Sequence, residues 1–311
     1  MKLKQTTRPG GLRLKKLSLW CVAAAAAILS LAAFVAGCSS VPVSLKRPVD
    51  AIELIDPESS FYIAVPKAVD TKLIERIVTG FYGNASASDA KMISERVTKI
   101  YCGLNRSKNE TEVQAAIDGA IPLKYLPKVL SEKNGWVSSD YSPNNGTSSY
   151  KIYGNQIELA FPTDSLAVVG RDVEGMLDRF DSLSSLPFFG NTEIKSDLDP
   201  ELISYLKGAE SEIRFYANKP QSFLTILTGA QLDLKLIDVK GSFVVDSKHD
   251  NQYLLTLDFR FKNGTFLRAG KTLLILAFGL TNSQEEIIGD NELIIHDIKM
   301  NKEQLYQLLA L

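Results

Sequence analysis

The chain carries one pattern twice, first as Glu58-Ser59-Ser60-Phe61-Tyr62-Ile63-Ala64-Val65-Pro66 and again as Glu212-Ile213-Arg214-Phe215-Tyr216-Ala217-Asn218-Lys219-Pro220. Each copy reads as a short strand that ends at a proline, because proline cannot continue a ladder of strand hydrogen bonds and often begins a helix. Each is followed by an apolar stretch of helical character that ends in Thr-Gly, over 73–80 and 223–229. The sequence therefore predicts a strand followed by a helix at the start of each of two halves.

The segments after these two starts follow the same order. In the first half they predict a strand at 110–121, a helix at 123–133, a strand pair at 150–169 around Gly154-Asn155 and a helix at 173–180. In the second half they predict a strand at 253–261, a helix at 265–280, a strand pair at 284–300 around Gly289-Asp290 and a helix at 302–309. The two turns are the closest local match, and both read as hairpins that lead into a strand.

The remaining segments favour antiparallel pairing. A strand at 236–245 is joined to strand 253–261 by the polar residues 246–251, which predicts a hairpin. Residues 138–149 are polar and predict a mobile loop. We interpret the chain as an α+β fold with mainly antiparallel sheets and packed helices, formed by tandem duplication of one α+β unit. Coincidence is the alternative, because alternation of helix and strand is common and the identities are few.

The predicted domain organisation follows from this order. It consists of a signal peptide at 1–37, a tether at 38–50, a first α+β unit at 51–182, a linker at 183–200 and a second α+β unit at 201–311.

The first residues have the layout of an export signal. Six basic residues within 2–16 precede an apolar run at 17–35, and the run ends in Val35-Ala36-Gly37-Cys38. Small residues directly before a cysteine resemble the lipobox of bacterial lipoproteins. That resemblance implies cleavage between Gly37 and Cys38, with lipid chains such as palmitate on Cys38 holding the protein to a membrane. A single transmembrane anchor is the alternative, since the apolar run approaches the length of a bilayer span.

The position after the cysteine and the net charge bear on location and partners. Ser39 stands where the lipoproteins retained in the inner membrane of enteric bacteria have aspartate, so the resemblance favours the outer membrane, on its periplasmic face or at the surface. Residues 1–37 hold six of the 35 basic residues and none of the 36 acidic ones, which leaves 29 against 36 and a net charge of −7. An acidic surface repels nucleic acid and anionic lipid, so bulk charge favours neither as a partner.

The search for catalytic chemistry finds no site. Gly264 and Gly270 precede Lys271 as in a phosphate-binding loop, but five residues separate the glycines where that loop needs four. The two histidines, His249 and His296, have no second histidine or cysteine at metal-ligand spacing. A nucleophile turn of the form Gly-x-Ser-x-Gly is missing from the sequence. We therefore expect a protein that is not an enzyme and that has no metal site and no cofactor.

Apolar helical surface is the more informative feature. The predicted helix at 265–280 is apolar nearly all round, so it must be buried against a sheet or meet a nonpolar partner. We expect its candidates for lipid or membrane contact to be Phe266, Leu267, Leu274 and Phe278. A core helix is the competing interpretation, because a short apolar stretch more often lies in a core. The matching segment in the first half, 123–130, is apolar with lysines on its flank, which suits the edge of a bilayer.

A lipobox, an acidic mature chain and apolar helices in an α+β domain are together similar to the outer-membrane-associated lipoproteins of treponemes and other spirochaetes. In some of those proteins, amphipathic helices around an α/β core insert into the inner leaflet or enclose lipid. Only Val35–Cys38 matches residue by residue, so the resemblance carries over no binding residues.

The resulting hypothesis is a membrane-anchored lipoprotein of the cell envelope that binds a nonpolar ligand, a lipid or the membrane surface. The alternative is a non-enzymatic interaction module for another envelope protein. A large apolar cavity beneath helix 265–280 would favour lipid binding. A dense core there, with an exposed sheet edge or apolar patch elsewhere, would favour a protein partner.

Overall fold

The computed structural model describes residues 47–81, 86–106, 111–143, 148–185, 196–228, 232–249, 251–278 and 284–308. The predicted signal peptide, its cleavage site at Gly37 and Cys38, and the tether as far as residue 46 lie outside the described residues, as do parts of the predicted linker and loop. From Lys46 onward the chain forms one compact unit.

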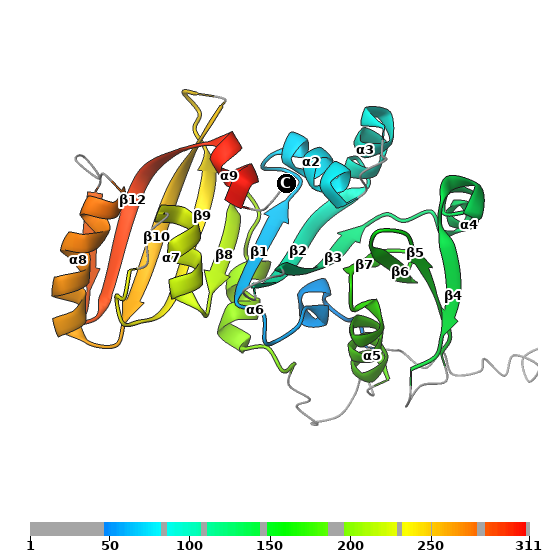
Figure 1. Ribbon diagram of the computed structural model, residues 1–311, viewed down its shortest axis with the longest axis horizontal. Helices are drawn as coiled ribbons and strands as arrows, with labels where there is room; N and C mark the ends of the chain where they lie inside the picture. The colour runs from blue at the N-terminus through cyan, green and yellow to red at the C-terminus, as the bar shows by residue number, and fades with distance from the viewer. Residues whose placement is uncertain are drawn as a thin grey trace, which may run out of the picture. The chain divides into compact units, whose positions relative to one another are not determined.

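The centre of this unit is a twelve-stranded sheet in the order β11-β12-β10-β9-β8-β1-β2-β3-β7-β6-β5-β4 (Figure 1), in which every neighbouring pair is antiparallel. The strands are β1 Phe61–Pro66, β2 Val97–Arg106, β3 Thr111–Gly119, β4 Val137–Tyr141, β5 Tyr150–Gly154, β6 Glu158–Thr163, β7 Leu166–Gly170, β8 Ile213–Ala217, β9 Leu236–Val245, β10 Gln252–Phe261, β11 Gln284–Ile288 and β12 Glu292–Asn301.

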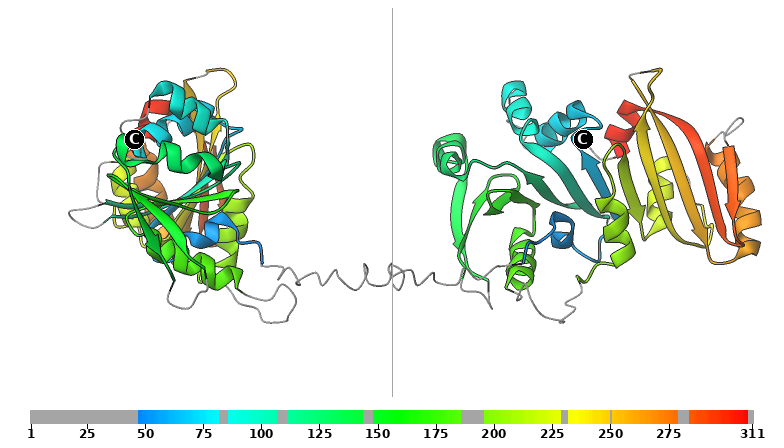
Figure 2. Two further views of the ribbon diagram at one scale, coloured as in Figure 1. Left: turned by 90° about the vertical axis from the view of Figure 1, so that its right-hand side faces the viewer. Right: turned by 180° about the vertical axis from the view of Figure 1, so that it is seen from behind.

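Helices lie on both faces of this sheet (Figure 2). One buried cluster joins the sheet to α2, α7, α8 and α9, and a second cluster on the other face joins it to η1, α5 and α6. The helical elements are η1 Ala51–Leu54, α2 Thr71–Phe81, α3 Ala87–Ser94, η2 Leu123–Tyr125, α4 Leu126–Val129, η3 Glu132–Asn134, α5 Val173–Ser184, α6 Pro200–Lys207, α7 Pro220–Thr228, α8 Gly264–Phe278 and α9 Lys302–Leu308. The predicted α+β class with mainly antiparallel pairing is confirmed.

The two copies of the repeated pattern meet at the middle of the sheet. β1 pairs with β8 so that Tyr62 lies directly opposite Tyr216, its counterpart in the sequence pattern. Outward from this pair, the order β8, β9, β10, β12, β11 on one side matches β1, β2, β3, β7, β6 on the other. The strand order is therefore that of a duplicated unit whose two copies share one sheet. The match ends at the last helices, because α5 and α9 pack on opposite faces.

Three predicted segments differ in the structure. The predicted helix at 123–133 is divided into η2, α4 and η3, because Pro127 lacks an N–H and its ring excludes the carbonyl four residues earlier. Part of the predicted loop at 138–149 belongs to β4, which pairs with β5, and 144–147 lie outside the described residues. The predicted strand pair at 150–169 is three strands, β5, β6 and β7.

The third difference changes how the halves align. Gly154-Asn155 joins β5 to β6, whereas Gly289-Asp290 joins β11 to β12. In the strand order β11 and β12 correspond to β6 and β7, whose connection is at Asp164-Ser165. The sequence similarity of the two Gly-containing turns therefore led to an alignment of turns that are not equivalent in the fold.

A largely buried ion pair connects α9 to the start of α2 in the first half of the unit. The Lys302 ammonium and the Tyr253 hydroxyl both donate to Asp70 Oδ2 at 2.7 Å. Asp70 also accepts from the N–H groups of Lys72 and Leu73 through Oδ1, where α2 begins. Burial alone raises the pKa of Asp70, but these donors outweigh it and hold that pKa below its ordinary value.

We predict that Asp70→Asn lowers the free energy of unfolding by about 3 kcal/mol at neutral pH, because it leaves the Lys302 charge buried without its counterion. The folded-state pKa of Asp70 is depressed, so its contribution is complete above the unfolded pKa near ~3.9 and is lost as pH falls through the folded value. Urea denaturation of residues 39–311 between pH 7 and pH 2 should show a smaller acid-dependent loss in the variant than in the parent.

The matched control is Glu303→Gln, which removes the exposed Arg76–Glu303 pair between the same two helices. An exposed pair contributes at most about 1 kcal/mol, so this change should be nearly neutral. Equal losses in the two variants would contradict the role assigned to Asp70.

Candidate functional site

α8 has one packed face and one open face. It begins at Asn263, whose side-chain oxygen accepts from the N–H groups of Thr265 and Phe266 at 3.1 Å. On its inner face Leu267 and Leu274 are buried in the core. Gly270 lies between them, and a Cβ atom at that position would come within 2.4 Å of the Phe261 ring. The absence of a side chain at Gly270 therefore lets α8 pack closely on β10.

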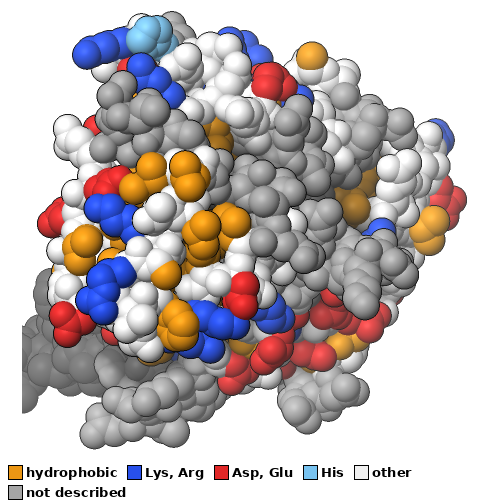
Figure 3. Space-filling model, turned by 60° about the vertical axis from the view of Figure 1, so that its left-hand side comes forward, with side chains coloured by type: hydrophobic (Ala, Val, Ile, Leu, Met, Phe, Trp, Pro, Cys, Tyr) orange, Lys and Arg blue, Asp and Glu red, His pale blue; other side chains and the backbone are white. Residues whose placement is uncertain are grey.

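The outer face of α8 exposes apolar side chains. Leu273 is 47% exposed and Leu276 is 72% exposed. Ile287 and Ile288 on the neighbouring edge strand β11 are also exposed, and the Lys271–Glu285 ion pair at 2.5 Å connects the helix to that strand. We call Leu273, Leu276 and Ile287 the α8 patch; Ile288 lies on the other face of the sheet, because side chains alternate along β11 and Glu285, which pairs with Lys271, shares its face with Ile287. Figure 3 shows apolar side chains gathered on the side of the molecule that bears α8, with lysines and arginines among them.

None of the four residues predicted to contact lipid belongs to the α8 patch. Leu267 and Leu274 point into the core, and Phe266 is half-buried against it. Phe278 ends α8, but its side chain lies outside the described residues. Lipid contact stays a prediction, and among the described side chains of α8 the large apolar ones that are exposed are Leu273 and Leu276. Sequence reasoning missed Ile287 and Ile288, although two isoleucines directly before a Gly-Asp turn were a usable signal.

A second exposed apolar surface lies at the opposite end of the sheet, beside α4 and β4 (Figure 1). We call its exposed residues, Leu123, Tyr125, Val129 and Val137, the α4 patch. Leu130, Trp136 and Tyr153 form a small buried cluster beneath it. The short turns of 123–134 are thus fixed to the sheet by their inner side chains, while the patch faces outward.

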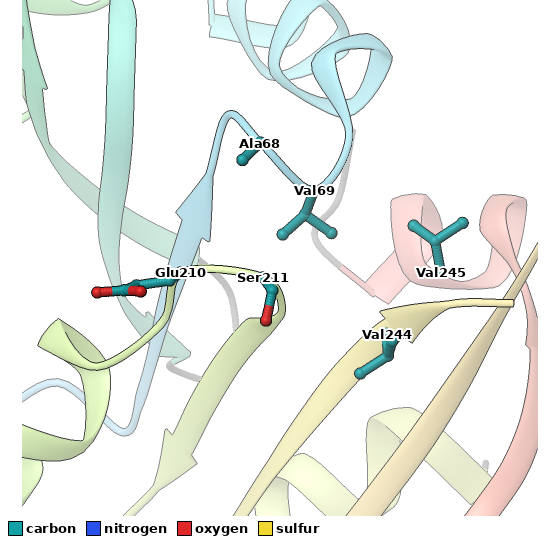
Figure 4. Close-up of a pocket in the computed structure, with 6 residues that line it drawn as sticks. All are labelled: Ala68, Val69, Glu210, Ser211, Val244 and Val245. Atoms are coloured by element: carbon teal, nitrogen blue, oxygen red, sulfur yellow. The ribbon is translucent and has the colours of Figure 1, made fainter. Parts of the chain in front are cut away.

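Two recesses lie among the described residues. The first is an open groove of about 400 Å³ lined by Ala68, Val69, Glu210, Ser211, Val244 and Val245 (Figure 4). The second, of about 90 Å³, lies beside α6 and is lined mainly by charged side chains. There Lys240 binds Asp258 at 3.0 Å, and burial nevertheless raises the pKa of Asp258 to about 6. The lining residues of the groove come from the loop after β1, the loop before β8 and the end of β9, so the groove does not lie beneath α8.

The described residues offer little for catalysis. Among them, no group of three or more His, Cys, Asp or Glu side chains is arranged to hold a metal ion. Cys102 is buried, and burial raises the pKa of its thiol to about 12, so the reactive thiolate is scarce at neutral pH.

None of the described helices is long and apolar enough to cross a membrane. The unit thus combines an antiparallel α+β sheet with exposed apolar helix faces, and it follows a segment that resembles a lipobox, as expected of an envelope lipoprotein.

The chain belongs to the TP0453 outer membrane-associated lipoprotein family, whose model matches residues 46–306. This confirms the predicted location in the cell envelope, anchored to a membrane.

Solved structures show the same fold. TP0453 comes from a spirochaete of the genus Treponema, and its crystal form I is 21% identical to this chain with a TM-score of 0.65. That match covers 85% of this chain and 98% of the TP0453 chain. Crystal forms III and IV cover the same shares at 20% identity, with TM-scores of 0.62 and 0.60. A comparison with curated proteins finds no match.

The two faces of α8 predict opposite responses to the same substitution. Leu274→Lys buries an unpaired charge, which costs several kcal/mol, on the order of the whole stability, so residues 39–311 should unfold or lose most of their resistance to urea. Leu276→Lys places the charge in solvent and should change the free energy of unfolding by no more than about 0.5 kcal/mol. A folded Leu274→Lys protein of parental stability would show that α8 is not packed as described.

Proposed function

We propose that this protein is a non-enzymatic envelope lipoprotein that places the α8 patch on the lipid surface of the membrane to which it is anchored. The observation that carries the proposal is the exposure of Leu273 and Leu276 on a helix whose inner face is already packed against the sheet. Single exposed apolar residues are ordinary, but several on one helix and on the same side of the adjoining strand are typical of an interaction site.

The N-terminal anchor makes a weak contact sufficient. Burying one leucine side chain contributes roughly 1.5–3 kcal/mol, so a few of them would hold a free protein to a bilayer only weakly. Lipid on Cys38 would keep the unit beside the bilayer at a high effective concentration, so the second contact is intramolecular in character. The α8 patch then has the role of orienting the unit on the membrane.

The dense packing under α8 argues against an enclosed lipid and, with the exposed sheet edge, meets the condition stated above for a protein partner. The outer-membrane association of the family is what favours contact with a lipid surface. Leu267 and Leu274 are buried, and Gly270 lies directly against Phe261, so this helix closes tightly on the sheet. The observation that favours the second candidate function, binding of another envelope protein, is the position of β11. As an edge strand that carries exposed Ile287 and Ile288, β11 could accept an added strand from a partner.

Flotation with vesicles tests the proposal. Residues 39–311 lack the predicted lipid anchor and contain the whole compact unit, which begins at Lys46, so flotation with phosphatidylcholine vesicles cannot come from the anchor. We expect the parent to float and Leu273→Ser/Leu276→Ser to bind roughly 10- to 100-fold more weakly, because two apolar side chains no longer leave water.

The matched control is Ile237→Ser/Val244→Ser, which removes two β9 residues that are 44% and 42% exposed and lie outside the patch. It should float as the parent does. Because the contact is weak without the anchor, flotation is measured at high lipid concentration. A parent protein that stays with the buffer even there, or equal losses in the two double variants, would refute the proposal and leave the protein-partner alternative.

A further inference from the structure

We propose that the α4 patch is a second membrane contact, and that it recognises the anionic headgroups of phospholipids through Lys124, Lys128 and Lys133. This inference rests on the proposed function, because it names the lipid chemistry that the opposite end of the sheet would meet.

The geometry presents apolar and basic side chains together. Tyr125 is 54% exposed and Val137 is 69% exposed, and Leu123 and Val129 are also exposed. The three lysines alternate with these residues along 123–133 and are exposed as well. Lys124 lies 4.9 Å from the centre of the Tyr125 ring, so one aromatic and one cationic group share the same surface. Tyrosine and lysine side by side are typical of the level at which lipid headgroups lie.

The lysines are available for a partner. In the described part of the chain, no carboxylate lies within ion-pair distance of Lys124, Lys128 or Lys133, whereas Lys151 on β5 is paired with Asp140. Within 122–137 only Glu132 is acidic. The segment is therefore a local basic surface on a chain that is acidic as a whole.

Local charge decides the interaction at contact distance. The Debye length is about 8 Å at physiological ionic strength, so acidic residues at the far end of the sheet are screened from a headgroup that touches this segment. Bulk charge alone predicts repulsion from anionic lipid, but three unpaired lysines at the point of contact predict attraction there.

The two ends of the sheet differ in this respect. α8 and β11 carry Arg268 and Lys271 against Glu285 and Glu286, and Lys271 is already paired with Glu285. The α8 patch should therefore bind by burial of apolar surface and respond little to salt. The α4 patch should respond to both salt and lipid charge.

The experiment compares vesicles of phosphatidylcholine with vesicles that also contain phosphatidylglycerol, using residues 39–311. Each lysine near an anionic surface gives about a fivefold gain in binding, so we expect Lys124→Gln/Lys128→Gln/Lys133→Gln to lose on the order of 100-fold on phosphatidylglycerol vesicles at low salt. Binding to phosphatidylcholine alone should change little. High salt should abolish the difference between parent and variant.

The matched control removes the same charge elsewhere, as Lys248→Gln/Lys262→Gln/Lys299→Gln, three exposed lysines of the second half. It should retain the response to phosphatidylglycerol. Trp136 supplies a positional readout, because it is the only tryptophan of residues 39–311 and lies directly beneath the patch. A lipid with a spin label on its headgroup should quench Trp136 fluorescence when the parent is bound to phosphatidylglycerol vesicles. It should not do so with Lys124→Gln/Lys128→Gln/Lys133→Gln.

The outcomes separate the two proposals. Flotation that is equal on both vesicles, or equal losses in the two triple variants, would overturn the inference about the α4 patch and leave the α8 proposal standing. The inference about the α4 patch would also be overturned if the fluorescence of Trp136 stayed unquenched when the parent is bound to phosphatidylglycerol vesicles. Failure of the parent to float on either vesicle would overturn both.

Discussion

The antiparallel pairing of β1 with β8 is the interaction on which the rest of the structure depends. It joins the two halves of the duplicated order into one sheet, with Tyr62 opposite Tyr216. Rings from both halves pack beside this seam, where Phe61, Phe215 and Phe223 lie with centroids 5.0 to 5.6 Å apart. A shift of one residue would move every side chain of the shifted strand to the other face, so the register is set by which residues each face can bury. The repeated Phe-Tyr pair meets that requirement on both strands at once.

Because the two halves form one sheet, the helices have to cover a surface twelve strands wide, and the α8 patch and the α4 patch lie toward the two ends of that sheet. α2, α7 and α9 lie toward the middle of the sheet, while α8 lies near the β11 edge and α4 near the β4 edge (Figure 1). The inner side chains of α8 are needed to bury β10 and β12, so Leu267 and Leu274 are not free for a partner. Its outer side chains have no further layer of the described chain above them.

Much of this arrangement could be predicted from the sequence, for physical reasons that differ between elements. β9 and β10 were predicted closely, since a strand with one buried face alternates apolar and polar residues with a period that no helix shares. The prediction of one helix at 123–133 was wrong, because Pro127 interrupts the helix although the spacing of the apolar residues still suits one. The orientation of α8 could not be predicted, because a helix that is apolar nearly all round does not reveal which face is buried. The contact of Gly270 with Phe261 fixes that face, and this contact joins two elements whose packing the sequence does not specify.

The distribution of charge gives the two ends of the sheet different physical characters. At the α8 end, acidic and basic residues balance and Lys271 is already paired, so only the removal of apolar surface from water can favour a membrane there. At the α4 end, lysines that have no carboxylate partner among the described residues accompany Tyr125 and Val129, so electrostatic attraction adds to burial. The net acidic charge of the remaining surface opposes approach of any other face to an anionic bilayer. Under the proposed function, this charge and the two patches therefore act together to select orientations in which the ends of the sheet face the lipid, and an anchor at the N-terminus alone cannot make that selection.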